Sequence, residues 1–286
     1  MHVITISNLK GGVGKTSIAF NMAAGLARRS AALSQGGRVL LLDMDPQGNA
    51  LKGISDTTQW ADVESLTSAI ADDDLLNIQS IQRRPLRELV RQAPAPWYPT
   101  LYFVPFREVT MVEVRRRAAH PDAPALMRNA FDSLRDDFDY VVVDTPPNTD
   151  DWLYNIFAAT DFIIVPVEMD EDAIQGASRI TQQVTARFGR AGRPRIIGYV
   201  PNKVVQRRLG DRSALSGLEQ LFGELLFPVS IPTSIDIRYS KAIRRDIYAF
   251  APDSPAALAM AQLVEETLRR IKSPIRSAKH GQPAAA

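Results

Sequence analysis

HVITISNLKGGVGKTS (residues 2–17) joins an apolar stretch, a glycine-rich loop and the start of a helical pattern. Residues 2–7 are predicted to form a buried strand, and apolar side chains recur at helical spacing over residues 16–29. Glycines at three loop positions let the backbone turn tightly, so that successive N–H groups point into an anion site beside the helix N-terminus. The pattern predicts a phosphate-binding loop whose nucleotide-contacting residues are Gly11, Gly12, Val13, Gly14, Lys15, Thr16 and Ser17.

Two lysines and a threonine give this loop its chemistry. Lys15 is a mobile cation suited to the β- and γ-phosphates of a nucleotide, and the Thr16 hydroxyl can ligate Mg²⁺. The ordinary pattern G-x-x-x-x-G-K-[ST] would place glycine at position 9, where this chain has Leu9. An additional lysine, Lys10, precedes the double glycine. ATP and Mg²⁺ are therefore the predicted cofactors.

Short apolar strands alternate with helical patterns along the chain, as in a parallel sheet wrapped by helices. The expected fold is a single α/β P-loop NTPase domain over residues 1–272, with a mostly parallel central sheet flanked by helices on both faces. Residues 273–286 are expected to form a disordered tail, and residues 30–37 are expected to form a surface insertion. Residues 52–100 have no assigned role. Further strands are predicted at 38–42, 100–104, 140–143, 162–167, 195–200 and 225–231, and further helices at 170–188 and 255–271.

The last predicted helix, residues 255–271, is amphipathic. Its polar face carries the i,i+4 pairs Glu265–Arg269 and Glu266–Arg270. A membrane-targeting helix is the alternative interpretation, but the apolar face has no aromatic residue and the polar face carries both signs of charge, unlike interfacial helices. We therefore expect no stable membrane insertion. The apolar face is predicted to consist of Leu258, Ala261, Val264, Leu268 and Ile271.

Composition excludes several classes of site. The 286 residues include no cysteine, which rules out disulfides, cysteine nucleophiles and thiolate-held metal clusters. The three histidines are scattered, so a histidine-based metal site has nothing to build on. The N-terminus lacks the features of a signal peptide, and no apolar run approaches the roughly 20 residues that a membrane helix needs. We expect a cytoplasmic protein.

Two further segments place carboxylates at the C-terminal ends of predicted strands, where open α/β sheets bind their ligands. LLDMDPQGNA (residues 41–50) carries Asp43 and Asp45, and VVVDTPP (residues 141–147) carries Asp144. An apolar strand that ends in aspartate is the Walker B pattern, which holds Mg²⁺ through water. Aspartates at strand ends also serve as helix caps or turn residues, so Asp43 and Asp45 gain their meaning from the neighbouring loop.

These motifs, K-G-G-x-G-K-[ST], D-x-D-P-Q-G-N and D-T-P-P, resemble those of the ParA/MinD family of deviant Walker A ATPases. The resemblance extends from the first strand to about residue 245, without residues 30–37, residues 52–100 and the tail. It implies that Lys10 is the signature lysine, which reaches across a nucleotide-sandwich homodimer to the phosphates bound by the partner. It implies catalytic roles for Lys10, Lys15 and Asp45, of which Asp45 orients the attacking water. It also implies a Mg²⁺ environment formed by Thr16, Asp43 and Asp144.

Two weaker signals concern the nucleotide base. Asn202 follows a predicted strand in PNK (residues 201–203) and could hydrogen-bond adenine. Pro232, in IPT (residues 231–233), lies in a segment that resembles the one lining the same pocket in the family. Asparagine and proline at strand ends are also routine turn residues, so each signal has a purely structural alternative.

The basic residues are concentrated in the last third of the chain. Residues 1–186 carry 17 Lys and Arg against 24 Asp and Glu, whereas residues 187–286 carry 17 against 8. A basic region on an otherwise acidic protein favours a polyanion partner, although solvated arginines are the plain alternative. By resemblance, the candidates for sequence-independent DNA contacts are Arg207, Arg208, Arg212, Arg238, Lys241, Arg244 and Arg245.

The first functional hypothesis is a ParA-type ATPase that drives plasmid or chromosome segregation, associates with the nucleoid and works with a ParB-like centromere-binding partner. The second is a related ATPase that positions a protein complex, membrane or organelle cargo. The third, a metabolic P-loop enzyme, would need a substrate pocket with its own polar residues, and the sequence offers none. Absence of cysteine excludes the cluster carriers and iron proteins of the family.

Overall fold

A seven-stranded sheet forms the centre of the structure, a computed structural model that describes residues 1–33, 37–55, 86–105, 118–148, 150–189, 192–205 and 209–272. The strand order is β3-β4-β2-β5-β1-β6-β7, and every pairing is parallel except that of β3 with β4. The parallel sheet expected from the sequence is therefore confirmed. The strands are β1 (His2–Ile6), β2 (Val39–Asp43), β3 (Arg91–Gln92), β4 (Leu101–Phe103), β5 (Tyr140–Asp144), β6 (Phe162–Val167) and β7 (Arg195–Pro201).

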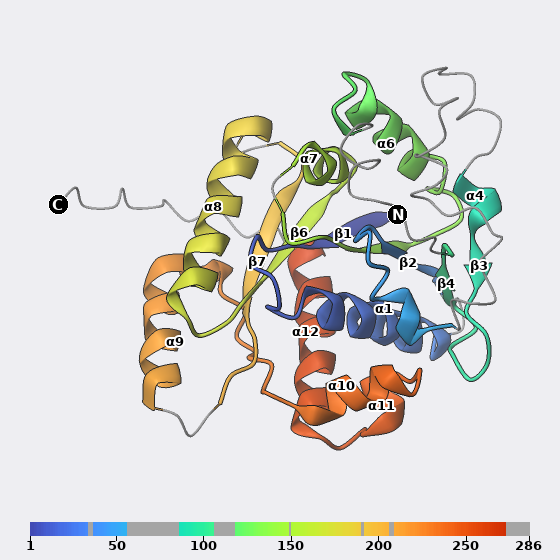
Figure 1. Ribbon diagram of the computed structural model, residues 1–286. Helices are drawn as coiled ribbons and strands as arrows, with labels where there is room; N and C mark the ends of the chain where they lie inside the picture. The colour runs from blue at the N-terminus through green and yellow to red at the C-terminus, as the bar shows by residue number, and fades with distance from the viewer. Residues whose placement is uncertain are drawn as a thin grey trace.

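Helices cover both faces of this sheet (Figure 1). The helix α1 packs on one face together with α12, with α10 and α11 beyond them, whereas α6, α7 and α8 cover the other face. The helices are α1 (Lys15–Ala31), η1 (Leu51–Gly53), α4 (Leu86–Leu89), α6 (Ala123–Asp132), α7 (Asp151–Ala158), α8 (Glu171–Phe188), α9 (Leu209–Phe222), η4 (Gly223–Leu225), α10 (Ile235–Ala242), α11 (Ile247–Phe250) and α12 (Pro255–Lys272).

The central strands are apolar along their whole length because both of their faces are buried. In β2, Leu40 and Leu42 pack in the cluster beneath α6 and α7, whereas Val39 and Leu41 join the cluster on the α1 side. Successive side chains of a strand point to opposite faces, so one strand contributes to both layers. This arrangement brings the C-terminal ends of β1, β2 and β5 together at one edge, where the glycine loop begins.

The apolar face predicted for the last helix is partly wrong. Val264 and Leu268 are buried as predicted, but Leu258 is 55% exposed, and the helix also buries Ala257 and Met260 in the cluster on the α1 side of the sheet. Helical spacing places Arg270 on the polar face, yet this residue is only 2% exposed. Its guanidinium donates to three carbonyl oxygens, those of Ile197, Leu225 and Leu226, and it pairs with Glu266 at 2.7 Å.

The predicted strand at residues 225–231 does not form a ladder. The segment runs beside β7, where Phe227 N donates to Tyr199 O and Ile231 N donates to Pro201 O, both at 2.8 Å. Pro228 lies between these two contacts and has no N–H to donate, so only isolated bridges remain.

Several expectations fall outside the described residues. These include the tail at 273–286, positions 34–36 of the expected insertion, and residues 56–85 within the unassigned segment. Within the described part of the chain, no helix has both the length and the apolar character needed to cross a membrane.

Candidate functional site

The glycine loop lies between the end of β1 and the start of α1, as the strand–loop–helix pattern predicts. Gly12 and Gly14 adopt left-handed backbone angles, with φ of 79° and 89°. A side chain at position 14 would also collide with Asn202, whose Nδ2 lies 2.2 Å from the place of a Cβ atom. Both the backbone angle and the close approach therefore require glycine at this position.

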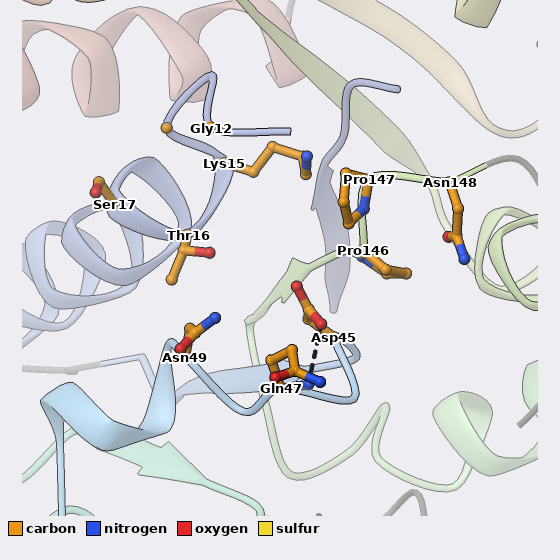
Figure 2. Close-up of a pocket in the computed structure, with 11 residues that line it drawn as sticks. Gly12, Lys15, Thr16, Ser17, Asp45, Gln47, Asn49, Pro146, Pro147 and Asn148 are labelled. Carbon is orange, nitrogen blue, oxygen red and sulfur yellow. Dashed lines mark hydrogen bonds between the residues drawn. The ribbon is translucent and has the colours of Figure 1, made fainter. Parts of the chain in front are cut away.

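A pocket of about 610 Å³ opens beside the loop, a volume within the usual range for small-molecule sites (Figure 2). Its wall combines the glycine loop with the two acidic segments that the sequence singles out. The lining residues are Gly12, Gly14, Lys15, Thr16, Ser17, Asp45, Gln47, Asn49, Pro146, Pro147 and Asn148. Val13, which belongs to the same loop, is fully buried.

Lys15 is almost enclosed at the base of this pocket. It is 6% exposed, and its ammonium donates to the Lys10 carbonyl oxygen at 3.0 Å. Burial lowers the pKa of Lys15, while the charges of Asp144 and Asp45 act in the opposite direction. A desolvated ammonium beside an open pocket interacts strongly with an anion, which is the role expected of a phosphate-binding lysine.

Asp43 organises the loop that follows β2. Its carboxylate accepts hydrogen bonds from the backbone N–H groups of Ala50 at 2.7 Å, Leu51 at 3.3 Å and Asp45 at 3.2 Å. Burial raises the pKa of Asp43 to about 7, and the charge of Asp45 adds to the rise. Because both oxygens already hold backbone groups, Asp43 fits a supporting role better than direct ligation of a metal.

Asp144 lies directly opposite Asp43 in the parallel pairing of β2 with β5 and is completely buried. Its Oδ1 accepts a bond from Thr145 N at 3.1 Å, whereas Oδ2 finds no hydrogen-bond partner among the described residues. Burial, followed by the charge of Asp43, raises the pKa of Asp144, and the nearby Thr16 hydroxyl and Lys15 ammonium oppose this rise. An unsatisfied carboxylate oxygen near a threonine hydroxyl has the donor chemistry that Mg²⁺ prefers, so Asp144 and Thr16 fit the expected ion.

Asp45 is the acidic side chain that lines the pocket itself. Its Oδ1 accepts a hydrogen bond from Gln47 N at 3.0 Å, which steadies the turn that carries it (Figure 2). The prediction that Asp45 orients water agrees with this placement and stays a prediction.

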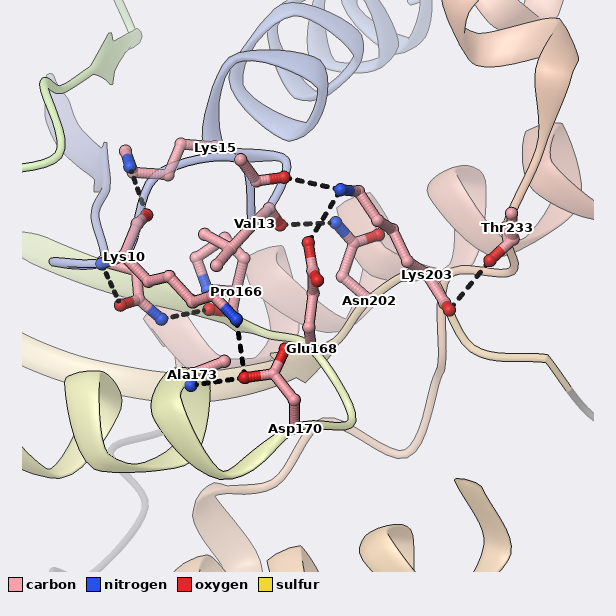
Figure 3. Close-up of polar contacts among 12 residues, drawn as sticks. Lys10, Val13, Lys15, Pro166, Glu168, Asp170, Ala173, Asn202, Lys203 and Thr233 are labelled. Atoms are coloured by element: carbon pink, nitrogen blue, oxygen red, sulfur yellow. Dashed lines mark hydrogen bonds and ion pairs between the residues drawn. The ribbon is translucent and has the colours of Figure 1, made fainter. Parts of the chain in front are cut away.

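Lys10 makes an ion pair within its own chain. Its ammonium donates to Asp170 Oδ1 at 2.6 Å, and the hydrogen bond to Asp170 raises the pKa of Lys10 (Figure 3). The same Asp170 oxygen accepts the Ala173 N–H at 2.8 Å and so caps the N-terminus of α8. Asn8 Nδ2 donates to Pro166 O at 2.6 Å, which ties the start of the loop to the same segment.

The two residues predicted for the base lie outside the pocket lining, and Asn202 contacts the loop. Asn202 is 4% exposed, and its Nδ2 donates to Val13 O at 2.7 Å. Pro232 forms an isolated parallel bridge with Val204. Their roles at a base stay predictions.

The predicted DNA-contacting residues differ in their surroundings. Arg238 on α10, and Arg244 and Arg245 just after it, are exposed. Lys241 is half-buried against Gly53, and burial lowers its pKa although Asp144 and Asp43 act in the opposite direction. Arg207 and Arg208, like the side chain of Arg212 on α9, lie outside the described residues.

Comparison with known proteins identifies the family to which this chain belongs. A family model described as an AAA domain matches residues 1–190. The chromosome-partitioning ATPase Soj of Thermus thermophilus is 31% identical over 271 residues, which cover 94% of this chain and 96% of that protein. The chain belongs to the ParA/MinD superfamily of ATPases. The resemblance recognised from the motifs is thereby confirmed.

Comparison with solved structures shows which proteins share the fold of this chain. A variant of Cyanothece McdA in complex with ATP has a TM-score of 0.74 at 18% identity and covers 96% of this chain and 99% of that one. The septum site-determining protein MinD of Pyrococcus horikoshii, complexed with Mg-ADP, has a TM-score of 0.70 at 20% identity, with 96% and 99% coverage. At these identities the likeness concerns the fold alone.

The sequence motifs do not predict three charged residues that support the phosphate loop through ion pairs. Glu168, Asp170 and Lys203 come from the ends of β6 and β7, far from the loop in sequence. The period-2 spacing of Glu168 and Asp170 after a strand was the available signal, since alternate residues share one side of an extended segment.

Proposed function

We propose that this chain is a ParA-type ATPase that binds Mg-ATP in the pocket described above, hydrolyses it slowly as a homodimer and binds DNA without sequence preference. In this proposal it segregates a plasmid or chromosome with a ParB-like partner. The observation that carries the proposal is the grouping of Lys15, Asp45 and Thr16 around one opening beside a left-handed glycine turn. The 31% identity to a chromosome-partitioning ATPase supports the biological role.

In this proposal the glycine loop, three charged or hydroxyl side chains of the pocket and the buried Asp144 each have a task in nucleotide binding. Loop N–H groups and the Lys15 ammonium bind the phosphate oxygens, and Thr16 and Asp144 hold the metal side of the site. When bound, Mg²⁺ neutralises charge on the β- and γ-phosphates. Asp45 accepts a hydrogen bond from the attacking water and aligns it with the terminal phosphorus.

Lys10 supplies the link to a second molecule. In the isolated chain its ammonium is paired with Asp170, and this side chain is 30% exposed, so the pair can open toward a partner. A lysine delivered in trans would stabilise charge on the partner's terminal phosphate, which couples hydrolysis to pairing. Exchange of one ion pair for another costs little, because partly exposed pairs contribute only about 0–1 kcal/mol.

The proposed DNA surface includes the exposed arginines Arg238, Arg244 and Arg245, together with Arg207 and Arg208. Arginine contacts to phosphates give affinity without sequence preference and make binding salt-dependent. Lys241 contributes less in this proposal because it is half-buried beneath the surface.

Hydrolysis with and without DNA, combined with sedimentation in ATP, tests the enzymatic part of the proposal. Wild type should form dimers in ATP, whereas Lys10→Ala should bind ATP yet stay monomeric and hydrolyse slowly. Lys272→Ala, an exposed change at the end of α12, serves as the control. Normal dimers and normal hydrolysis in Lys10→Ala would count decisively against a role in trans.

Charge reversal tests the DNA part. Arg207→Glu combined with Arg208→Glu should weaken nonspecific DNA binding, with ATP binding intact, and should reduce the salt slope by roughly one for each phosphate that is no longer neutralised. Arg128→Glu combined with Arg135→Glu, at the α6 side of the sheet, changes the net charge equally and should leave DNA binding nearly unchanged. Equal effects of the two pairs would place the DNA surface elsewhere.

A further inference from the structure

Two carbonyl oxygens of the phosphate loop accept hydrogen bonds from side chains that directly follow β7. Lys203 Nζ donates to Gly12 O at 2.6 Å, and Asn202 Nδ2 donates to Val13 O at 2.7 Å (Figure 3). Neither side chain belongs to the pocket lining. Both therefore contact the loop from outside the pocket lining.

Lys203 is itself anchored. Its ammonium pairs with Glu168 Oε1 at 2.7 Å, and Glu168 directly follows the end of β6 (Figure 3). The Glu168 side chain is 22% exposed and that of Lys203 is 48% exposed. The ion pair thus joins the ends of the neighbouring strands β6 and β7 to one peptide of the loop.

The backbone at Lys203 supports a functional interpretation of this contact. Its φ is 56°, in the left-handed region that residues other than glycine rarely adopt. The conformation is imposed by neighbouring bonds: Asn202 N donates to Val167 O at 2.8 Å, and the Lys203 carbonyl accepts the Thr233 hydroxyl at 2.8 Å. Strain that the surroundings enforce is typical of functional sites.

The geometry of a peptide unit explains what the contact does. In a trans peptide the C=O and the following N–H point in opposite directions within one plane. A cation that fixes the Gly12 carbonyl therefore turns the Val13 N–H away from Lys203. The charge on Lys203 also polarises this peptide and strengthens its N–H as a donor to an anion.

We propose that Lys203, anchored by Glu168, is a positioning residue of the nucleotide site that aims the Val13 N–H at a bound phosphate. It differs from Lys10 and Lys15 because it acts through the loop and does not touch the nucleotide. This inference rests on the proposed binding of ATP, and it adds a third lysine and its carboxylate partner to the site.

Calorimetric titration of the full-length protein with Mg-ATP tests this role through variants with opposite side effects. Lys203→Met should raise the Kd for ATP roughly tenfold, the usual effect of removing a charged hydrogen bond. Lys203→Gly should weaken ATP binding as much while leaving the Tm unchanged or higher, because glycine tolerates the left-handed angle. Lys272→Met, an exposed lysine far from the loop, should bind ATP like wild type.

Glu168→Gln separates positioning from simple attraction of charge. Removal of a negative charge near the pocket would by itself strengthen ATP binding, whereas loss of the anchor should weaken it severalfold. Weaker binding in Glu168→Gln and Lys203→Gly supports the inference. Wild-type affinity in Lys203→Gly, or tighter binding in Glu168→Gln, overturns the inference while the proposed function stands. Failure of the wild type to bind ATP overturns the proposed function as well.

Discussion

Asp144→Asn should stabilise the protein when nucleotide and Mg²⁺ are absent. Asp144 and Asp43 are paired in register on neighbouring strands, and both are buried. Among the described residues, Asp144 Oδ2 has no hydrogen-bond partner that the amide nitrogen of asparagine would displace. Neighbouring strands lie about 4.8 Å apart, so two ionised carboxylates would repel each other by roughly 3 kcal/mol at an effective dielectric constant of about 20. Asparagine at this position removes the repulsion while keeping the shape of the side chain.

The pH dependence has a defined sign. Burial raises the pKa of Asp43 to about 7, and burial together with Asp43 raises that of Asp144. A carboxyl group whose pKa is higher in the folded state favours folding when protonated, so its contribution is full below about pH 4 and is lost as the pH rises toward 7. Unliganded wild type should therefore lose stability between about pH 4 and 7, and Asp144→Asn should recover roughly 2–3 kcal/mol at pH 8.

Differential scanning calorimetry in EDTA at pH 5 and pH 8 measures this difference. The variant should melt roughly 5 °C above wild type at pH 8 and closer to it at pH 5. Asp253→Asn, an exposed change in the turn before α12, is the matched control and should have no effect. A variant that melts at or below the wild-type temperature at pH 8, or an equal difference at both pH values, would refute the argument from paired carboxylates.

Three further substitutions probe the loop and the scaffold. Gly14→Ala would place a Cβ 2.2 Å from Asn202 Nδ2 at a φ of 89°, so titration calorimetry should record at least a tenfold loss of ATP affinity. Gly217→Ala fills open space in the helix α9, and thermal melting should report a gain of about 1 kcal/mol. Arg270→Met leaves three carbonyl oxygens without their donor and removes one of the two arginines that pair with Glu266, so urea unfolding should report a loss of about 3 kcal/mol.

The phosphate loop was predictable because its requirements are local. Tight glycine turns, a preceding apolar strand and a following helical pattern all appear within about 30 residues, and the structure places Gly12, Lys15 and Thr16 around one pocket. The acidic segments were predictable for a similar reason, since parallel strands end at the same edge. Asp45 and Asn148 accordingly meet the loop at that edge.

Contacts between distant segments were not predictable in the same way. Nothing near Lys203 in the sequence indicates that it adopts a left-handed angle or pairs with Glu168, because both facts depend on the packing of β6 beside β7. Arg270 looks like a surface residue by helical spacing, yet its guanidinium fills a gap lined with carbonyl groups. Helical periodicity predicts which face of the helix a side chain occupies. It does not predict that a charged group on that face will be buried against hydrogen-bond acceptors of a neighbouring segment.

Asp170 uses one oxygen for two purposes, to hold the ammonium of Lys10 and to hold the first turn of α8. Departure of the lysine would leave the backbone bond to Ala173 in place, so the helix would not unravel when the lysine leaves. The molecule can therefore release and recapture this side chain repeatedly without local unfolding. In the proposed homodimer, repeated association and separation of two copies would then be limited by the nucleotide rather than by rebuilding of the scaffold.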